Sequence, residues 1–104
     1  MTKTMVWRRL DSKEAFIEAF ADRPLVGEGL QFTIHADGQI SGMAGPDRLL
    51  GNWYWQDGMF CRTATLNDED LGLDREIIEQ CGDQMRYTRD SGKGAASIVT
   101  IKPL

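Results

Sequence analysis

Residues Gly51 to Arg62 read GNWYWQDGMFCR, and this stretch decides the fold. Two aromatic-rich segments flank Asp57-Gly58, a dipeptide that forms two-residue turns whose backbone twist matches that of paired strands. Counting outward from this turn gives the cross-strand pairs Trp55 with Phe60, Tyr54 with Cys61 and Trp53 with Arg62. The sequence therefore predicts an antiparallel hairpin with one strongly aromatic face.

The rest of the chain after residue 27 shows the same sequence pattern, in which apolar and polar residues alternate between turn dipeptides. Asp37-Gly38 and Gly82-Asp83 are the other two turns, and the first of them should place Phe32 opposite Met43. The expected strands are 30–34, 39–43, 49–56, 59–66, 76–81, 84–89 and 96–101. About seven short strands joined by tight turns predict an antiparallel meander that curls into a barrel or half-barrel.

One helix is expected before the sheet, over residues 11–23. Asp11 can cap it, and Glu14 three positions later completes a capping box. Phe16 and Phe20 then follow at the spacing of one helical face. Pro24 ends the pattern, because the residue before a proline is pushed out of the helical region. The fold class is therefore mainly β with one N-terminal helix (α+β), in which the sheet covers about residues 29–102.

Composition limits the classes of function. A chain of 104 residues has room for one domain, expected here over residues 1–104. The net charge is −4 and Arg8-Arg9 is the only adjacent basic pair, which disfavours nucleic acid, since a phosphate backbone calls for a basic stripe. The first residues lack the apolar run of a signal peptide and nothing approaches the length of a membrane span. We therefore expect a cytoplasmic protein that does not bind membranes.

The aromatic face of the central hairpin is the candidate binding site. Trp53, Trp55 and Phe60 share this face, and Arg62 lies directly across from Trp53. In a pocket, the rings would hold an apolar ligand while Arg62 pairs with a carboxylate or phosphate. In a packed core, the same arginine would stack on Trp53 at the rim. The sequence leaves both arrangements open.

Cys61 and Cys81 fall on strands that are consecutive in the predicted meander, so they can lie side by side as a redox pair. A disulfide would stabilise the fold by roughly 3 kcal/mol, but such bonds are rare in a reducing cytoplasm, which favours free thiols. Together with His35 they give only three zinc ligands, without a recognisable spacing. We therefore expect no metal site here.

No catalytic group stands out. The run 67–70, NDED, fails the spacing of a calcium loop and is expected to be a solvated charge run. Glu76 and Glu79 are not separable from surface charges, and no serine–histidine–acid set can be argued. We therefore expect no catalytic residue and no cofactor.

The order GNWYWQDGMFCR, then EQCG around the second cysteine, then RYTRDSGKG resembles a group of short alphaproteobacterial proteins. Those proteins are often labelled dihydrodipicolinate reductase. Their pattern runs W-x-W-x-D-G-x-F-C-R, a cysteine, then S-D-x-G-x-G, of which residues 89–94 are a reordered match. The label implies a nicotinamide enzyme, yet the chain has no G-x-G-x-x-G after a strand and no room for a second domain. No catalytic residue is therefore transferred.

A looser likeness links the hairpin and the later cysteine to small lipocalin-like bacterial domains. The leading hypothesis is a non-catalytic domain that binds a small amphipathic ligand or a protein partner through the aromatic face. A structural, self-associating module is the second hypothesis, because strand 96–101 could pair with another copy to form a homodimer. An enzyme that matches the reductase label is the third.

Overall fold

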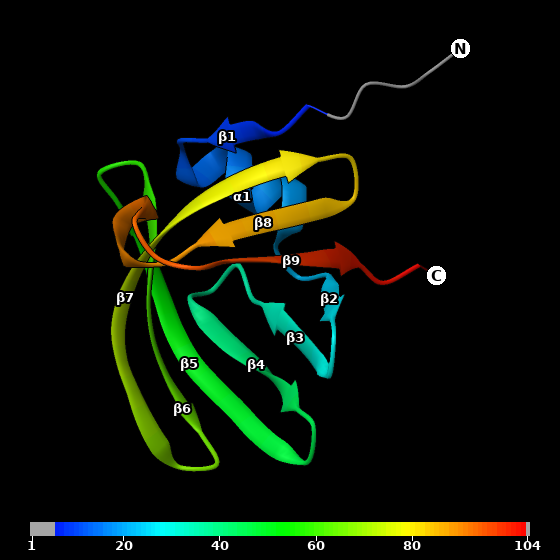
Figure 1. Ribbon diagram of the computed structural model, residues 1–104, viewed down its shortest axis with the longest axis vertical. Helices are drawn as coiled ribbons and strands as arrows, with labels where there is room; N and C mark the ends of the chain where they lie inside the picture. The colour runs from blue at the N-terminus through cyan, green and yellow to red at the C-terminus, as the bar shows by residue number, and fades with distance from the viewer. Residues whose placement is uncertain (1–5, 104) are drawn as a thin grey trace.

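The computed structural model describes residues 6–103 of the chain, which form nine strands, one α-helix and one short 3-10 turn (Figure 1). The elements are β1 Arg8–Leu10, α1 Lys13–Phe20, β2 Pro24–Gly27, β3 Leu30–Ile34, β4 Gln39–Ala44, β5 Asp47–Gln56, β6 Met59–Leu66, β7 Glu69–Cys81, β8 Gln84–Thr88, η1 Asp90–Gly92 and β9 Ala96–Ile101. The predicted mainly β chain with one N-terminal helix is confirmed.

Strands β2 to β9 form a closed, eight-stranded antiparallel barrel. Each strand pairs with the next one along the chain, and β2 pairs with β9 to complete the ring. The short strand β1 is an addition: Leu10 pairs with Ile78 of β7, just beyond Glu76, where the pairing of β6 with β7 ends. The predicted meander that curls into a barrel is therefore confirmed.

The sequence missed β1 and β2. Strand β2 opens with Pro24, whose position suits a proline because the first residue of a strand can do without a ladder N–H. The strand 96–101 is a free edge only in part. All of β9 except Ile101 pairs with β8, while Thr100 and Ile101 pair with β2. On the β2 side, barrel closure thus occupies only Thr100 and Ile101, and within the described residues positions 96–99 of β9 pair with β8 alone.

The central hairpin has the predicted register. Trp53 pairs with Arg62, and the next two pairs toward the turn also match the prediction. Asp57 and Gly58 both have positive φ, at 55° and 73°, which is the backbone of a two-residue hairpin turn of the expected kind. The turn residues therefore fix this part of the fold.

The hairpin at Asp37-Gly38 differs from the prediction by one residue. Phe32 pairs with Gly42 and not with Met43. The backbone N–H of His35 donates to the carbonyl of Gln39, so the loop contains three residues, 36–38, where we expected two. A single added loop residue shifts every pair along the two strands.

The helix is shorter than predicted at both ends, and Asp11, the predicted cap, lies one residue before the observed cap. Ser12 is the N-cap, with its hydroxyl accepting from the backbone N–H of Ala15. At the other end, Ala21 is extended and Asp22 has a φ of 63°. The N–H of Asp22 donates to the carbonyl of Ile34, so pairing with the sheet ends the helix before Pro24 does.

The acidic run 67–70 is half turn and half strand. Asn67 and Asp68 form the turn, with φ of 52° and 71°, and Glu69 already begins β7. We had expected the strand to begin only at residue 76. A bulge near Leu71 interrupts the pairing, since Ala64 of β6 faces Gly72 whereas Thr65 faces Asp70. Bulges of this kind bend a strand and raise its local twist.

Helix α1 closes one end of the barrel, and its apolar face supplies part of the core (Figure 1). Phe16 and Phe20 are fully buried, and the ring of Phe16 lies 5.3 Å from that of Trp53 and 5.2 Å from that of Phe60. The buried core is completed by Leu10, Leu25, Phe32, Ile34, Ile40, Ile78, Met85 and Val99. The helix therefore turns an open ring into a cup with an aromatic floor.

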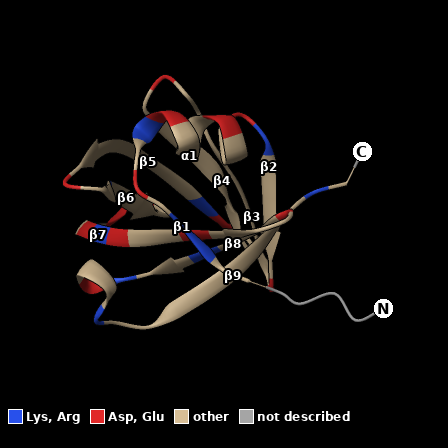
Figure 2. Ribbon diagram, turned by 90° about the horizontal axis from the view of Figure 1, so that it is seen from above, with Lys and Arg blue, Asp and Glu red and all other residues tan. Residues whose placement is uncertain are grey.

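Seen from above, acidic and basic segments are scattered around the ring (Figure 2). Across residues 6–103, no helix has the length and apolar character needed to cross a membrane.

Candidate functional site

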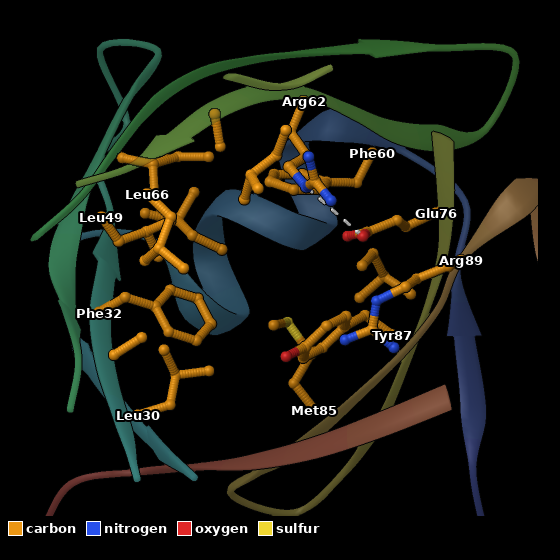
Figure 3. Close-up of a pocket in the computed structure, with 16 residues that line it drawn as sticks. Leu30, Phe32, Leu49, Phe60, Arg62, Leu66, Glu76, Met85, Tyr87 and Arg89 are labelled. Carbon is orange, nitrogen blue, oxygen red and sulfur yellow. Dashed lines mark ion pairs between the residues drawn. The ribbon is translucent and has the colours of Figure 1, made fainter. Parts of the chain in front are cut away.

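A cavity of about 220 Å³ lies inside the barrel (Figure 3). Its apolar walls are Leu30, Phe32, Ile34, Ile40, Ala44, Leu49, Phe60, Ala64, Leu66, Leu71, Ile78 and Met85. Leu71, at the bulge of β7, is 47% exposed, so the cavity reaches the surface there. Its polar groups belong to Arg62, Glu76, Tyr87 and Arg89. The inside of the cup is thus mostly apolar with a few charged groups on one side.

Glu76 is the charged residue that lies deepest in this wall, since only 4% of it is exposed. Its carboxyl points into the cavity beside Arg62, with 3.7 Å between Oε2 of Glu76 and Nε of Arg62 (Figure 3). A second carboxylate, that of Asp74, lies 3.8 Å from the guanidinium of Arg62. Both ion pairs are longer than a good charge-assisted hydrogen bond.

Arg62 uses little of its hydrogen-bonding capacity. Of its contacts within residues 6–103, the one at hydrogen-bond distance is donation from its Nη1 to the carbonyl of Gly72, at 3.3 Å. A guanidinium carries five N–H donors. Arg62 therefore keeps donors available on the side that faces the cavity and Glu76.

Burial raises the pKa of Glu76 from 4.5 to about 8. Desolvation is the main cause, because it penalises the charged carboxylate, and the neighbouring Asp74 adds to it. Arg62 and Arg89 oppose the shift through their positive charges without cancelling it. At neutral pH the carboxyl of Glu76 is consequently protonated in most molecules and can donate a hydrogen bond.

Arg89 and Tyr87 form the other side of this polar wall. The guanidinium of Arg89 lies over the ring of Tyr87, 5.1 Å from its centroid. Two further contacts hold it, to the carbonyl of Ala95 at 3.1 Å and to the hydroxyl of Ser97 at 3.0 Å. Figure 3 shows Arg62 and Arg89 on either side of the Glu76 carboxyl. The arginine side chain is thus positioned by its neighbours.

The predicted aromatic face divides between the cavity and the floor of the cup. Phe60 and Arg62 line the cavity, as the prediction of a ligand pocket requires. Trp53, 5% exposed, donates from Nε1 to the carbonyl of His35 at 2.7 Å and packs on Phe16. Trp55 also packs on Phe16. Both indoles thus lie outside the cavity lining, and the buried part of this face offers no surface to a protein partner.

The two cysteines do not lie side by side, and both are free. Cys61 pairs with Arg75 of β7, whereas Cys81 comes six residues later on the same strand. At roughly 3.3 Å per residue this separates them by about 20 Å, far beyond the reach of a disulfide. Burial raises the pKa of the Cys61 thiol, which makes it a poor nucleophile.

A serine–histidine–acid arrangement lies on the outside of the barrel. Nε2 of His35 is 2.7 Å from the hydroxyl of Ser41, and its Nδ1 is 4.0 Å from Asp22. Sequence reasoning did not predict this arrangement, since these residues come from three separate segments. Ser41 sits within β4 and does not line the barrel cavity, so the arrangement lacks the enclosed, donor-lined site that acyl transfer requires. We interpret the arrangement as a structural contact that links the end of β3 to β4.

Within residues 6–103 no group of three or more His, Cys, Asp or Glu side chains is placed to hold a metal ion. Searches of protein-family models, curated proteins and solved structures gave no significant match. The geometry of the cavity therefore carries the functional argument.

Sequence reasoning identified Phe60 and Arg62 but missed Glu76, Tyr87 and Arg89. A signal for Glu76 was present, because it is two residues before the fully buried Ile78 and so shares its face of the strand. The sequence analysis did not separate Glu76 from the surface charges, whereas in the structure only 4% of this residue is exposed.

Proposed function

We propose that this small β-barrel is a non-catalytic domain that binds a small amphipathic ligand inside the barrel. The observation that carries the proposal is the cavity itself, an apolar volume with a charged wall on one side. Small-molecule sites in proteins share this composition: a mostly hydrophobic lining and a few polar groups that fix orientation.

The cavity volume fits a ligand of modest size. An apolar cavity of about 150 Å³ in a protein core accommodates benzene. The present cavity of about 220 Å³ is roughly half as large again, which favours a ligand with an apolar part of about eight carbon atoms. Pockets for drug-sized ligands begin near 300 Å³, so a large ring system is disfavoured.

The packing around the cavity supports a preformed site. Its floor is the aromatic cluster that α1 completes, and strand pairing closes its sides all the way around the ring. A rigid, preformed site loses little conformational entropy on binding. The interior of the barrel, rather than its surface, is therefore where we expect the ligand.

The proposal is tested by filling the cavity with a larger side chain. Ala64 is buried and lines it, whereas the neighbouring Thr63 points outward on the same strand. We expect the wild-type protein to bind 1-octanol or octanoate in calorimetry, Ala64→Phe to abolish binding, and the control Thr63→Phe to retain it. Ala44→Phe fills the cavity from β4 and serves as the second variant if Ala64→Phe does not fold. Binding that survives in folded filled variants would place the ligand elsewhere and refute the proposal.

A further inference from the structure

We infer that the ligand carries a single carboxylate, which lies between Arg62 and Arg89 beside the carboxyl of Glu76. This inference rests on the proposed function and adds the chemical class of the ligand. It depends on three observations: donors of Arg62 that remain available, a nearly fully buried Glu76, and an imbalance of charge at this wall.

The available donors favour an oxygen-rich head group. Arg62 donates to one backbone carbonyl and lies 3.7 Å from Glu76 and 3.8 Å from Asp74. A ligand carboxylate can approach to a distance of about 2.8 Å and form the short, paired contact that an arginine fork prefers. The head group would thus supply a better partner than either of the two carboxyls already present.

The charges that face Glu76 favour an anion. Arg62 on β6 and Arg89 beyond β8 bring two positive charges, while Asp74 on β7 brings one negative charge. Asp74 is also held by a backbone N–H, that of Asp90, at 3.0 Å. With Glu76 protonated, one positive charge is left without a partner. A monocarboxylate neutralises it, whereas an amine would add to it.

In this arrangement Glu76 supplies a hydrogen-bond donor to the ligand. A buried carboxyl that keeps its proton can donate a hydrogen bond to the incoming carboxylate, so the two share one proton between two oxygens. If Glu76 loses the proton, the two anions repel each other in a site largely shielded from water. Binding of the carboxylate should therefore require the proton on Glu76 and weaken as the pH rises.

The experiment compares three probes with the same chain: octanoate, 1-octanol and octylamine. In calorimetry at pH 7 we expect octanoate to bind most tightly and octylamine least tightly. Arg62→Gln should weaken octanoate binding by about tenfold to a hundredfold and leave 1-octanol nearly unchanged, because a charge-assisted contact is lost only with the anion. Arg86→Gln is the matched control, since Arg86 pairs with Glu79 away from the cavity.

The pH dependence is an independent measurement on the wild-type protein. With a Glu76 pKa of about 8, octanoate binding should weaken by about tenfold from pH 7 to pH 9, while 1-octanol binding stays constant. Glu76→Gln keeps a neutral donor, so octanoate should still bind and its affinity should lose this dependence on pH. Arg89→Gln serves as the second arginine variant if Arg62→Gln does not fold.

The outcomes separate the two proposals. If 1-octanol or octylamine binds in the cavity at least as tightly as octanoate, the inference that the ligand is a carboxylate is wrong, while the proposed binding function stands. The same holds if Arg62→Gln and Arg89→Gln leave octanoate affinity unchanged. If none of the three probes binds, or filling the cavity at Ala64 has no effect, both proposals fail.

Discussion

Glu76 should make the stability of the protein depend on pH in a direction that is unusual for a carboxylate. Its pKa is about 8 in the folded protein and close to 4.5 in the unfolded chain, where it is solvated. Between these two values the folded state holds one proton more than the unfolded state. The free energy of unfolding must therefore fall as the pH rises through this window.

The magnitude follows from the pKa values. A difference of one pH unit between folded and unfolded pKa corresponds to about 1.4 kcal/mol. The contribution of Glu76 is fully present below pH 4.5, and up to about 5 kcal/mol should be lost by pH 8, after which both states are deprotonated. Glu76→Gln has no proton to lose, so its stability should lack this slope and exceed that of the wild type at pH 9.

The assay is urea unfolding, followed by tryptophan fluorescence at several pH values from 5 to 9. The comparison of wild type and Glu76→Gln isolates one group, because every other titrating residue is common to both. Glu79→Gln is the control. Arg86 lowers the pKa of Glu79, so that pair loses its contribution only as the pH falls below about 4.5, and this variant should keep the slope. Equal slopes for wild type and Glu76→Gln would refute the reasoning.

The remaining predictions concern the floor of the cup and the thiols. Trp53→Ala should lower the free energy of unfolding by about 3–5 kcal/mol in urea unfolding, because it empties a packed site and removes the bond to His35. Tyr54→Ala, on the outer face, should cost far less; a loss of ligand response with unchanged stability at Trp53 would instead make that residue part of the binding site. In thiol labelling of the native protein, Cys81 should react and Cys61 should react only after unfolding. Mild oxidation should not join them, and an intramolecular disulfide in the folded protein would contradict the register.

The accuracy of each sequence-based prediction depended on which interactions determine the element concerned. At Asp57-Gly58 the turn type determines the register, so the pairing of Trp53 with Arg62 was predicted correctly. At Asp37-Gly38 the same dipeptide lies within a three-residue loop, and the prediction was wrong by one position. The choice between the two loops depends on pairing further along the strands, which the dipeptide does not encode.

The amino-acid sequence by itself determined the local features of this protein: the tight turns, the amphipathic helix, and the alternation that gives the predicted strands one inward face. These follow from turn chemistry and from periodicity, which act over a few residues. It also placed Phe60 and Arg62 on one face of a sheet, because residues two apart on a strand point the same way.

Only the tertiary structure decided that the ring closes through β2 and β9, that α1 fills one end and leaves a cavity near the other, and that Glu76 is enclosed with Arg62 and Arg89. These residues come from β6, β7 and the segment after β8, and a charged side chain looks the same in sequence whether water or a barrel surrounds it. The burial that raises the pKa of Glu76 depends on all the strands together. No single segment of the chain determines this burial.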